Sequence, residues 1–204
     1  MGQNSLGAAP TDRQEPPVPH PRPWSPLTDA EYALLAPHLP LTGPGRPIAD
    51  PRARLDAIFQ AVTSTLPWRH TRSPHAATDT VHRTFRRWAR AGVWSRLLKL
   101  AARKRAPKTL RRLIDWIAAC HRRTYRILGL PVLALARRLN IPNALPGPSW
   151  MLPDPNLSEM VHRCVFWALS QPLTQAIRPY LRNCIRLLRT AEGRRRIPAS
   201  LIPQ

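Results

Sequence analysis

The chain has 204 residues, enough for one domain or two small ones, and 43% of them are apolar. It carries 32 Lys and Arg residues against 11 Asp and Glu residues, a formal net charge of +21. This balance argues against an ordinary neutral metabolic enzyme and favours a polyanionic partner: DNA, RNA or an anionic membrane surface. The excess of positive charge begins at Arg83, because residues 1–81 hold 7 basic and 7 acidic residues.

The cysteines and the apolar runs indicate the compartment. The three cysteines are an odd number without a CxxC pair, which is typical of reduced thiols in a cytosolic protein. The first 26 residues lack the apolar core of a secretory signal, and no apolar run reaches the 18 or so residues that span a bilayer. We therefore expect a cytoplasmic protein without a transmembrane segment.

Residues 1–26 are expected to form a disordered, proline-rich arm, and order is expected to begin at Leu27. The T-x-x-E sequence from Thr28 to Glu31 predicts a capped helix over about 29–36. Asp50-Pro51 starts a second helix that ends by Pro67. A third helix is expected from a cap at Thr78-Asp79 to Gly92, and a fourth from there to about residue 103. Residues 27–103 are therefore predicted to be a compact all-α unit.

The second half, residues 104–204, also has helical periodicity. Apolar residues share one face of an expected helix over 108–128, and shorter helices are expected at 132–139 and 157–170. Residues 140–156 are predicted to be a linker or a rigid loop. A last helix over 172–191 carries a basic edge and is expected to kink at Pro179. The predicted fold class is all-α: a helix-turn-helix bundle followed by basic amphipathic helices.

The segment 78–94 carries the clearest signal for function. Its short helix combines a narrow apolar stripe of Val81, Phe85 and Trp88 with four arginines on the remaining surface. A helix that reads the major groove needs such an apolar back, together with arginines that can contact guanine edges or phosphates. The alternative on pattern alone is an ordinary solvated basic face.

At this point the sequence resembles a known family. Residues 27–103 look like the N-terminal helix-turn-helix domain of bacterial insertion-sequence transposases of the IS-five or IS-four type. The residues that carry the resemblance run in order through several loops: Leu27-Thr28-Asp29, Glu31, Leu35, Pro37, Leu39-Pro40, Gly45-Arg46-Pro47, Arg54-Leu55-Asp56-Ala57-Ile58-Phe59, Pro67-Trp68-Arg69, Thr80-Val81, Arg83, Phe85-Arg86-Arg87-Trp88 and Gly92-Val93-Trp94.

The resemblance implies that residues 27–103 recognise double-stranded DNA at the terminal inverted repeats of an insertion element. A homodimer or a full-length transposase are the protein partners that we expect. The candidate DNA-binding residues are Arg46, Arg69, Thr78, Thr80, Arg83, Arg86, Arg87 and Arg90.

Full-length transposases of this kind carry an RNase-H-like domain in which Asp, Asp and Glu hold two divalent metals. After residue 103 this chain has four acidic residues, of which Asp115, Asp154 and Glu192 are the candidates for such a triad. Catalytic carboxylates of this type need a sheet to bring them together, and no strand pattern is visible. We therefore expect that the catalytic domain is absent and that the protein has no strand-transfer chemistry of its own, with a divergent or truncated active transposase as the alternative.

Cofactor and metal sites are not expected. Cys120-His121 and His162-x-Cys164 do not have the spacing of a zinc finger or ribbon, and each pair falls on or near an apolar helical stripe. Three interpretations of residues 104–204 stay open. Their basic helices contact DNA phosphates, or they bind anionic membrane or RNA as in a peripheral protein, or the region is a remnant left by a truncation or frameshift.

Overall fold

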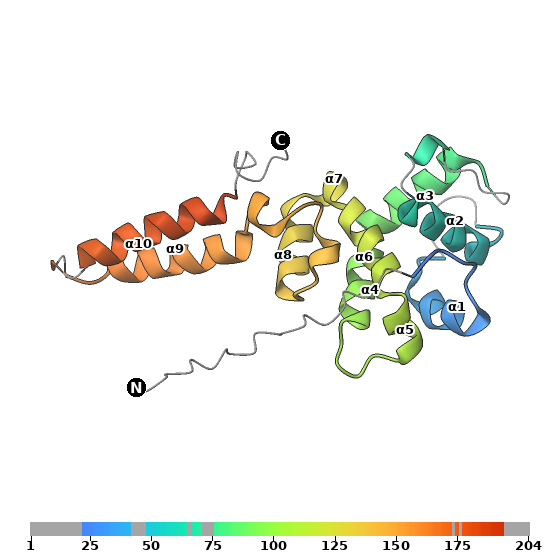
Figure 1. Cartoon of the computed structure of the whole chain (residues 1–204), viewed down its shortest axis with the longest axis horizontal. Coiled ribbons are helices and arrows are strands. Elements are labelled where there is room, and N and C mark those ends of the chain that lie inside the picture. The colour runs from blue at the N-terminus through green and yellow to red at the C-terminus, as the bar shows by residue number, and fades with distance from the viewer. Residues whose placement is uncertain are drawn as a thin grey trace, which may run out of the picture.

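The structure is a computed structural model of the chain. It describes residues 22–41, 48–64, 67–70, 76–172, 174–175 and 177–193. All the regular elements in these ranges are helices (Figure 1), which confirms the all-α prediction. Residues 1–21, most of the predicted disordered arm, lie outside the described residues.

The first four helices form where the local signals predict them. They are α1 (Asp29–Leu35), α2 (Pro51–Thr63), α3 (Thr78–Arg90) and α4 (Val93–Ala101), with the short 3-10 helix η1 (Ala36–His38) after α1. Thr28 and Glu31 form the predicted capping box, and Asp50 caps α2 through the backbone N–H of Ala53. Gly92 has φ 71° in the two-residue turn between α3 and α4. The predicted cap of α3 is wrong: Ala77 is the N-cap, no side chain caps this end, and Thr78 is the first helical residue.

The predicted single helix over 108–128 is broken into α5 (Lys108–Arg112), α6 (Ile114–Arg123) and α7 (Tyr125–Leu128). Thr124 separates α6 from α7, and its hydroxyl donates a hydrogen bond to the carbonyl of His121 at 2.6 Å. The amphipathic pattern is also interrupted, because six consecutive residues of α6, from Trp116 to His121, are buried. They are covered from several sides, since α6 packs against α2, α4 and the 3-10 helix η3 (Pro142–Ala144).

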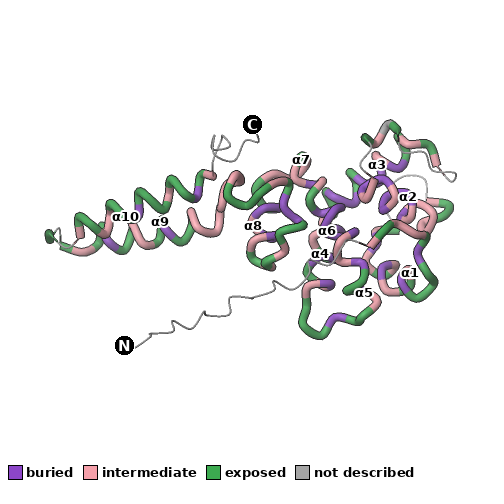
Figure 2. Tube along the Cα trace, viewed as in Figure 1, coloured by how far each residue is buried: buried purple, intermediate pink, exposed green. Residues whose placement is uncertain are grey.

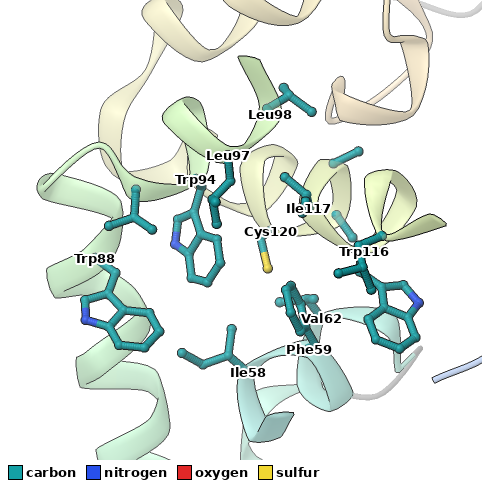
Figure 3. Packing of buried hydrophobic residues seen from close by; sticks show 14 of the residues in the cluster. Ile58, Phe59, Val62, Trp88, Trp94, Leu97, Leu98, Trp116, Ile117 and Cys120 are labelled. Atoms are coloured by element: carbon teal, nitrogen blue, oxygen red, sulfur yellow. The ribbon is translucent and has the colours of Figure 1, made fainter. Parts of the chain in front are cut away.

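A single hydrophobic core runs from Leu27 to Leu145. Figure 3 shows aromatic side chains of α2, α3, α4 and α6 meeting in this core, with Cys120 among them. The ring centroid of Phe59 lies 6.3 Å from that of Trp94 and 5.5 Å from that of Trp116. Helices α5 and α6 therefore share one core with α1–α4, and the predicted division at residue 103 does not coincide with a gap in the packing.

The folded part of the chain begins before Leu27, because residues 22–26 contact the core. The indole N–H of Trp116 donates to the carbonyl of Arg22 at 2.9 Å, and the Arg22 guanidinium lies 4.6 Å from the Trp116 ring centroid. Arg22 also forms an ion pair with Glu31, and Trp24 packs against the core. Residues 22–26 are thus part of the fold, contrary to their prediction as disordered arm.

The C-terminal part of the described chain is a helical hairpin. It follows α8 (Leu130–Arg138) and the 3-10 helix η4 (Ser149–Met151), and it consists of α9 (Pro155–Leu169) and α10 (Ile177–Ala191). The hairpin projects from the core (Figure 1), and most of its residues are exposed or half-buried (Figure 2). Pro179 produces no kink within a longer helix, because α10 begins at Ile177 and its first turn lacks backbone N–H partners in any case.

Candidate nucleic-acid interface

Helix α3 separates its apolar and basic residues onto two faces. Val81, Phe85 and Trp88 are buried in the core, and at most 3% of the surface of each residue is exposed. The opposite face is exposed and consists of Thr80, Arg83, Arg86, Arg87 and Arg90, five of the candidate DNA-binding residues. The helix is thus anchored by aromatic packing, while its arginines face solvent.

Three of the exposed residues, Thr80, Arg83 and Arg87, line a concavity of about 420 Å³ together with Arg54 of α2. Arg54 is held in place, because its guanidinium donates to the Thr84 hydroxyl at 3.2 Å. Burial, followed by the charge of Arg87, lowers the pKa of the Arg54 guanidinium. The concavity therefore concentrates positive charge, and no carboxylate of the described residues forms an ion pair with these arginines.

Sequence reasoning did not assign Arg54 to the interface. It lies within the family signature, but the local pattern of α2 gives no indication that its side chain meets α3. Because α2 also carries Arg52, Asp56 and Gln60, no signal in its sequence distinguishes Arg54 as a residue of the interface.

Arg86 lies on the other flank of α3, apart from the concavity around Arg54. It lines a second cavity of about 740 Å³ with Arg122, Arg123 and Arg126, which come from α6 and α7. Burial lowers the pKa of Arg123, and the neighbouring charges of Arg122 and Arg126 lower it further, against an opposing effect of Cys120. The structure thus divides the predicted arginines between two basic sites, one on each flank of α3.

The other predicted site residues are more peripheral. Arg46 lies outside the described residues. The backbone of Arg69 lies in the 3-10 helix η2 (Trp68–His70), while its side chain is outside the described part of the chain. Thr78 is half-buried at the start of α3, and Arg90 is exposed at its end.

The geometry around α3 differs from the arrangement that the sequence suggested. The connection from α2 to α3 spans residues 64–77 and includes η2, so it is much longer than the turn of a helix-turn-helix. The tight turn lies instead between α3 and α4, at Ala91-Gly92. α3 buries five of its 13 residues and α4 buries five of its 9, so α3 has the larger exposed face to offer to a groove.

The candidate acidic triad is not assembled into a metal site. Asp154 caps α9 through the backbone N–H of Leu157 at 3.1 Å, and it forms an ion pair with Arg137 at 3.3 Å. Asp115 accepts a hydrogen bond from the Asn143 amide at 3.3 Å. Within the described ranges, no group of three or more His, Cys, Asp or Glu side chains is arranged to hold a metal ion, and neither Cys120-His121 nor His162 and Cys164 form one.

His121 lies in the core rather than at a functional site. It is fully buried, its Nε2 donates to the carbonyl of Val132 at 3.1 Å, and its Nδ1 lies 3.5 Å from the Ser95 hydroxyl. Burial lowers the pKa of His121, partly offset by the hydrogen bond to Val132. Burial also raises the pKa of the Cys120 thiol well above its usual value. Both residues are therefore neutral members of the core.

The class that these features define is an all-helical domain whose third helix displays arginines over a tryptophan-rich core. Comparison with family models makes this specific: residues 27–98 match the family described as "Putative transposase of IS4/5 family". The match confirms the resemblance of this N-terminal region to that family. The match ends within α4, so helices α5–α10 lie beyond it. Searches of curated proteins and of solved structures gave no match.

Proposed function

We propose that the protein is a DNA-binding protein derived from an insertion-sequence transposase, and that it recognises the terminal inverted repeats of an element through the exposed face of α3. One observation carries the proposal. Arg54, Arg83 and Arg87 converge on one concavity, and none of them forms an ion pair with a carboxylate among the described residues. A set of arginines without internal counterions favours an external polyanion.

The roles within this site follow from how each arginine is held. Arg54 is fixed by Thr84 and half-buried, so it suits contact with a backbone phosphate that sets the register. Arg83 and Arg87 are exposed on α3, and an α-helix fits the major groove of B-DNA. Their guanidinium groups can pair with the O6 and N7 atoms of guanine in the bidentate manner that distinguishes bases.

The proposal also covers chemistry, partners and location. Because Asp115, Asp154 and Glu192 are not grouped at one site, the chain supports binding to element ends without strand transfer of its own. Such a protein would regulate a full-length transposase by occupying its sites, alone or as a homodimer, in the cytoplasm. Docking of α3 in the major groove, as the helix that reads the bases, belongs to the same proposal.

Fluorescence anisotropy tests the proposal, with a duplex of the terminal repeat and a scrambled duplex across a salt series. We expect a preference of about tenfold or more for the repeat near 0.15 M salt, because purely electrostatic binding would treat both duplexes alike. Arg83→Ala or Arg87→Ala should cost about 1–3 kcal/mol and reduce the preference. Arg182→Ala in α10 removes the same charge from an exposed site elsewhere and serves as the control.

Two results would contradict the proposal. One is equal binding of both duplexes by the wild-type protein at every salt concentration. The other is unchanged discrimination in both α3 variants, which would remove Arg83 and Arg87 from the reading site. Mg²⁺-dependent cleavage of the bound duplex would instead restore the alternative of an active transposase, with substitution of Asp115 as its first check.

A second candidate function rests on the α9–α10 hairpin. Phe166, Trp167 and Leu169 are 72%, 58% and 61% exposed near its free end, where Arg178 and Arg182 are also exposed. Exposed apolar side chains beside arginines are typical of helices that bind an anionic membrane surface. No helix in the described part of the chain is long and apolar enough to cross a bilayer. Sedimentation with phosphatidylserine vesicles tests this function: it requires that the wild-type protein pellets at moderate salt and that Phe166→Ser weakens pelleting.

A further inference from the structure

The cavity on the Arg86 flank of α3 has a composition that duplex binding does not explain. It has a volume of about 740 Å³, within the range of sites that enclose a small molecule. Its walls come from four separate segments: Pro67-Trp68, α3, Pro146, and the junction of α6 and α7. The last of these segments lies outside the transposase match, so the cavity joins the matched domain to the helices that follow it.

Of the described residues, four arginines and no acidic residue line the cavity. Arg86 and Arg126 are exposed and make no hydrogen bond or ion pair with the described residues. Arg122 and Arg123 contact only neutral groups, donating to the carbonyls of Asn143 at 3.3 Å and Ser64 at 3.1 Å. Four like charges around one space repel one another until an anion enters, so the cavity favours a ligand with one or more phosphate groups.

The same cavity presents aromatic rings, which a site for phosphate alone would not need. Trp68 is braced by Phe85 and His82, with ring centroids at 5.1 and 5.2 Å, and the Arg123 guanidinium lies 5.4 Å from its centroid. Tyr125 is half-buried at the cavity wall, and its ring makes no stacking contact with another described ring. A flat apolar group could therefore stack against Tyr125 beside the arginines.

A phosphate joined to a flat ring is the chemistry of a nucleotide. A base inside a duplex is paired and stacked on its neighbours, so it cannot enter a walled cavity unless it is unpaired. We propose that this cavity binds an unpaired nucleotide of a DNA strand, with its phosphate between Arg86, Arg122 and Arg126 and its base against Tyr125. Arg83 and Arg86 are both exposed and lie about one helical turn apart on α3, so a strand bound at the concavity around Arg54 would cross α3 to reach this cavity.

This inference rests on the proposed function for how DNA arrives, but its test separates the two. Binding is measured with the blunt repeat duplex and with the same duplex carrying a four-nucleotide single-stranded extension. We expect the wild-type protein to bind the extended duplex about tenfold tighter, which is the scale of stacking one base on an aromatic side chain. Tyr125→Ala should abolish this preference and leave blunt-duplex affinity unchanged, while Tyr125→Phe should keep both.

Tyr125→Ala does not change the net charge, so a loss of preference cannot be attributed to weaker electrostatics. Tyr180→Ala, in α10 and outside the cavity, is the matched control and should behave as wild type. Should Tyr125→Ala fail to fold by circular dichroism, Arg126→Ala replaces it, since Arg126 is exposed and forms no ion pair with another described residue. That variant should lose more affinity for the extended duplex than for the blunt one.

Each outcome is decisive. Tight, sequence-specific binding of the blunt duplex with no gain from the extension overturns the inference and leaves the proposed function intact. Equal binding of repeat and scrambled duplexes, with a Tyr125-dependent gain from the extension, supports the cavity and overturns the proposed specificity. Displacement of the extended duplex to blunt-duplex affinity by micromolar deoxynucleoside monophosphate identifies a free nucleotide as the ligand and overturns the strand assignment.

Discussion

Replacing Trp116 with alanine tests whether the transposase-like region folds together with the helices beyond it. Trp116 lies in α6, outside the matched residues 27–98, but it is 1% exposed and its ring lies 5.5 Å from Phe59 of α2. Its indole N–H bonds to the carbonyl of Arg22, whose guanidinium lies over the same ring. A single side chain thus connects α6 with α2 and with the segment that precedes α1.

The expected loss follows from these contacts. Truncation of a buried tryptophan to alanine typically costs about 3–5 kcal/mol. The hydrogen bond to Arg22 adds about 1 kcal/mol, and the cation–π contact adds about 0.5–1 kcal/mol in a partly exposed setting. Since these terms are not additive, we expect the free energy of unfolding to fall by about 4 kcal/mol. Single domains are stabilised by only about 5–15 kcal/mol, so the variant should be severely destabilised.

Urea unfolding followed by far-UV circular dichroism measures the effect. Trp150→Ala is the matched control, because Trp150 is 41% exposed, and its loss should stay below about 1 kcal/mol. If residues 27–103 folded independently, Trp116→Ala would give two transitions, with the one for α1–α4 at the wild-type urea concentration. That result, or a loss below about 1 kcal/mol, would refute the shared core.

Three further predictions concern local features. Burial lowers the pKa of His121, so the unfolded chain binds a proton at a higher pH than the folded protein does. The free energy of unfolding should therefore fall as the pH drops below about 6.5. His121→Gln should flatten this part of the pH profile of urea unfolding, and an unchanged slope would contradict the assignment. Thr28→Ala removes one of the two hydrogen bonds of the capping box with Glu31 and should lower the free energy of unfolding by about 1 kcal/mol. Thermal unfolding measures this loss, and an unchanged stability would show that the cap does not contribute. Gly193 has φ 75°, and a Cβ there would lie 2.7 Å from the Leu152 backbone carbon. Gly193→Ala should therefore loosen the contact between the end of α10 and Leu152, seen as faster hydrogen exchange there, and unchanged exchange would disprove the close approach.

The local signals in the sequence were sufficient for the first four helices. Capping residues at Thr28 and Asp50, the apolar spacing of α2 and α3, and Gly92 act within one or two turns, so they can be read without knowing the fold. The exposed arginine face of α3 follows from the same periodicity, because an aromatic stripe that must be buried leaves the remaining positions to solvent. The family signature adds the order of these elements through their loops.

The second half of the chain and the sites on α3 were decided by contacts between segments far apart in the sequence. Six consecutive residues of α6 are buried because helices and η3 cover it from several sides, an arrangement that no periodicity of α6 could predict. Arg54 reaches the reading face because α2 packs against α3, and Arg122 and Arg126 share a cavity with Arg86 because α7, which follows α6, packs against α3. The sequence by itself determined the first four helices and which face of α3 is basic. Tertiary packing decided which distant arginines join that face, since pairing of surfaces depends on the shape of the whole core.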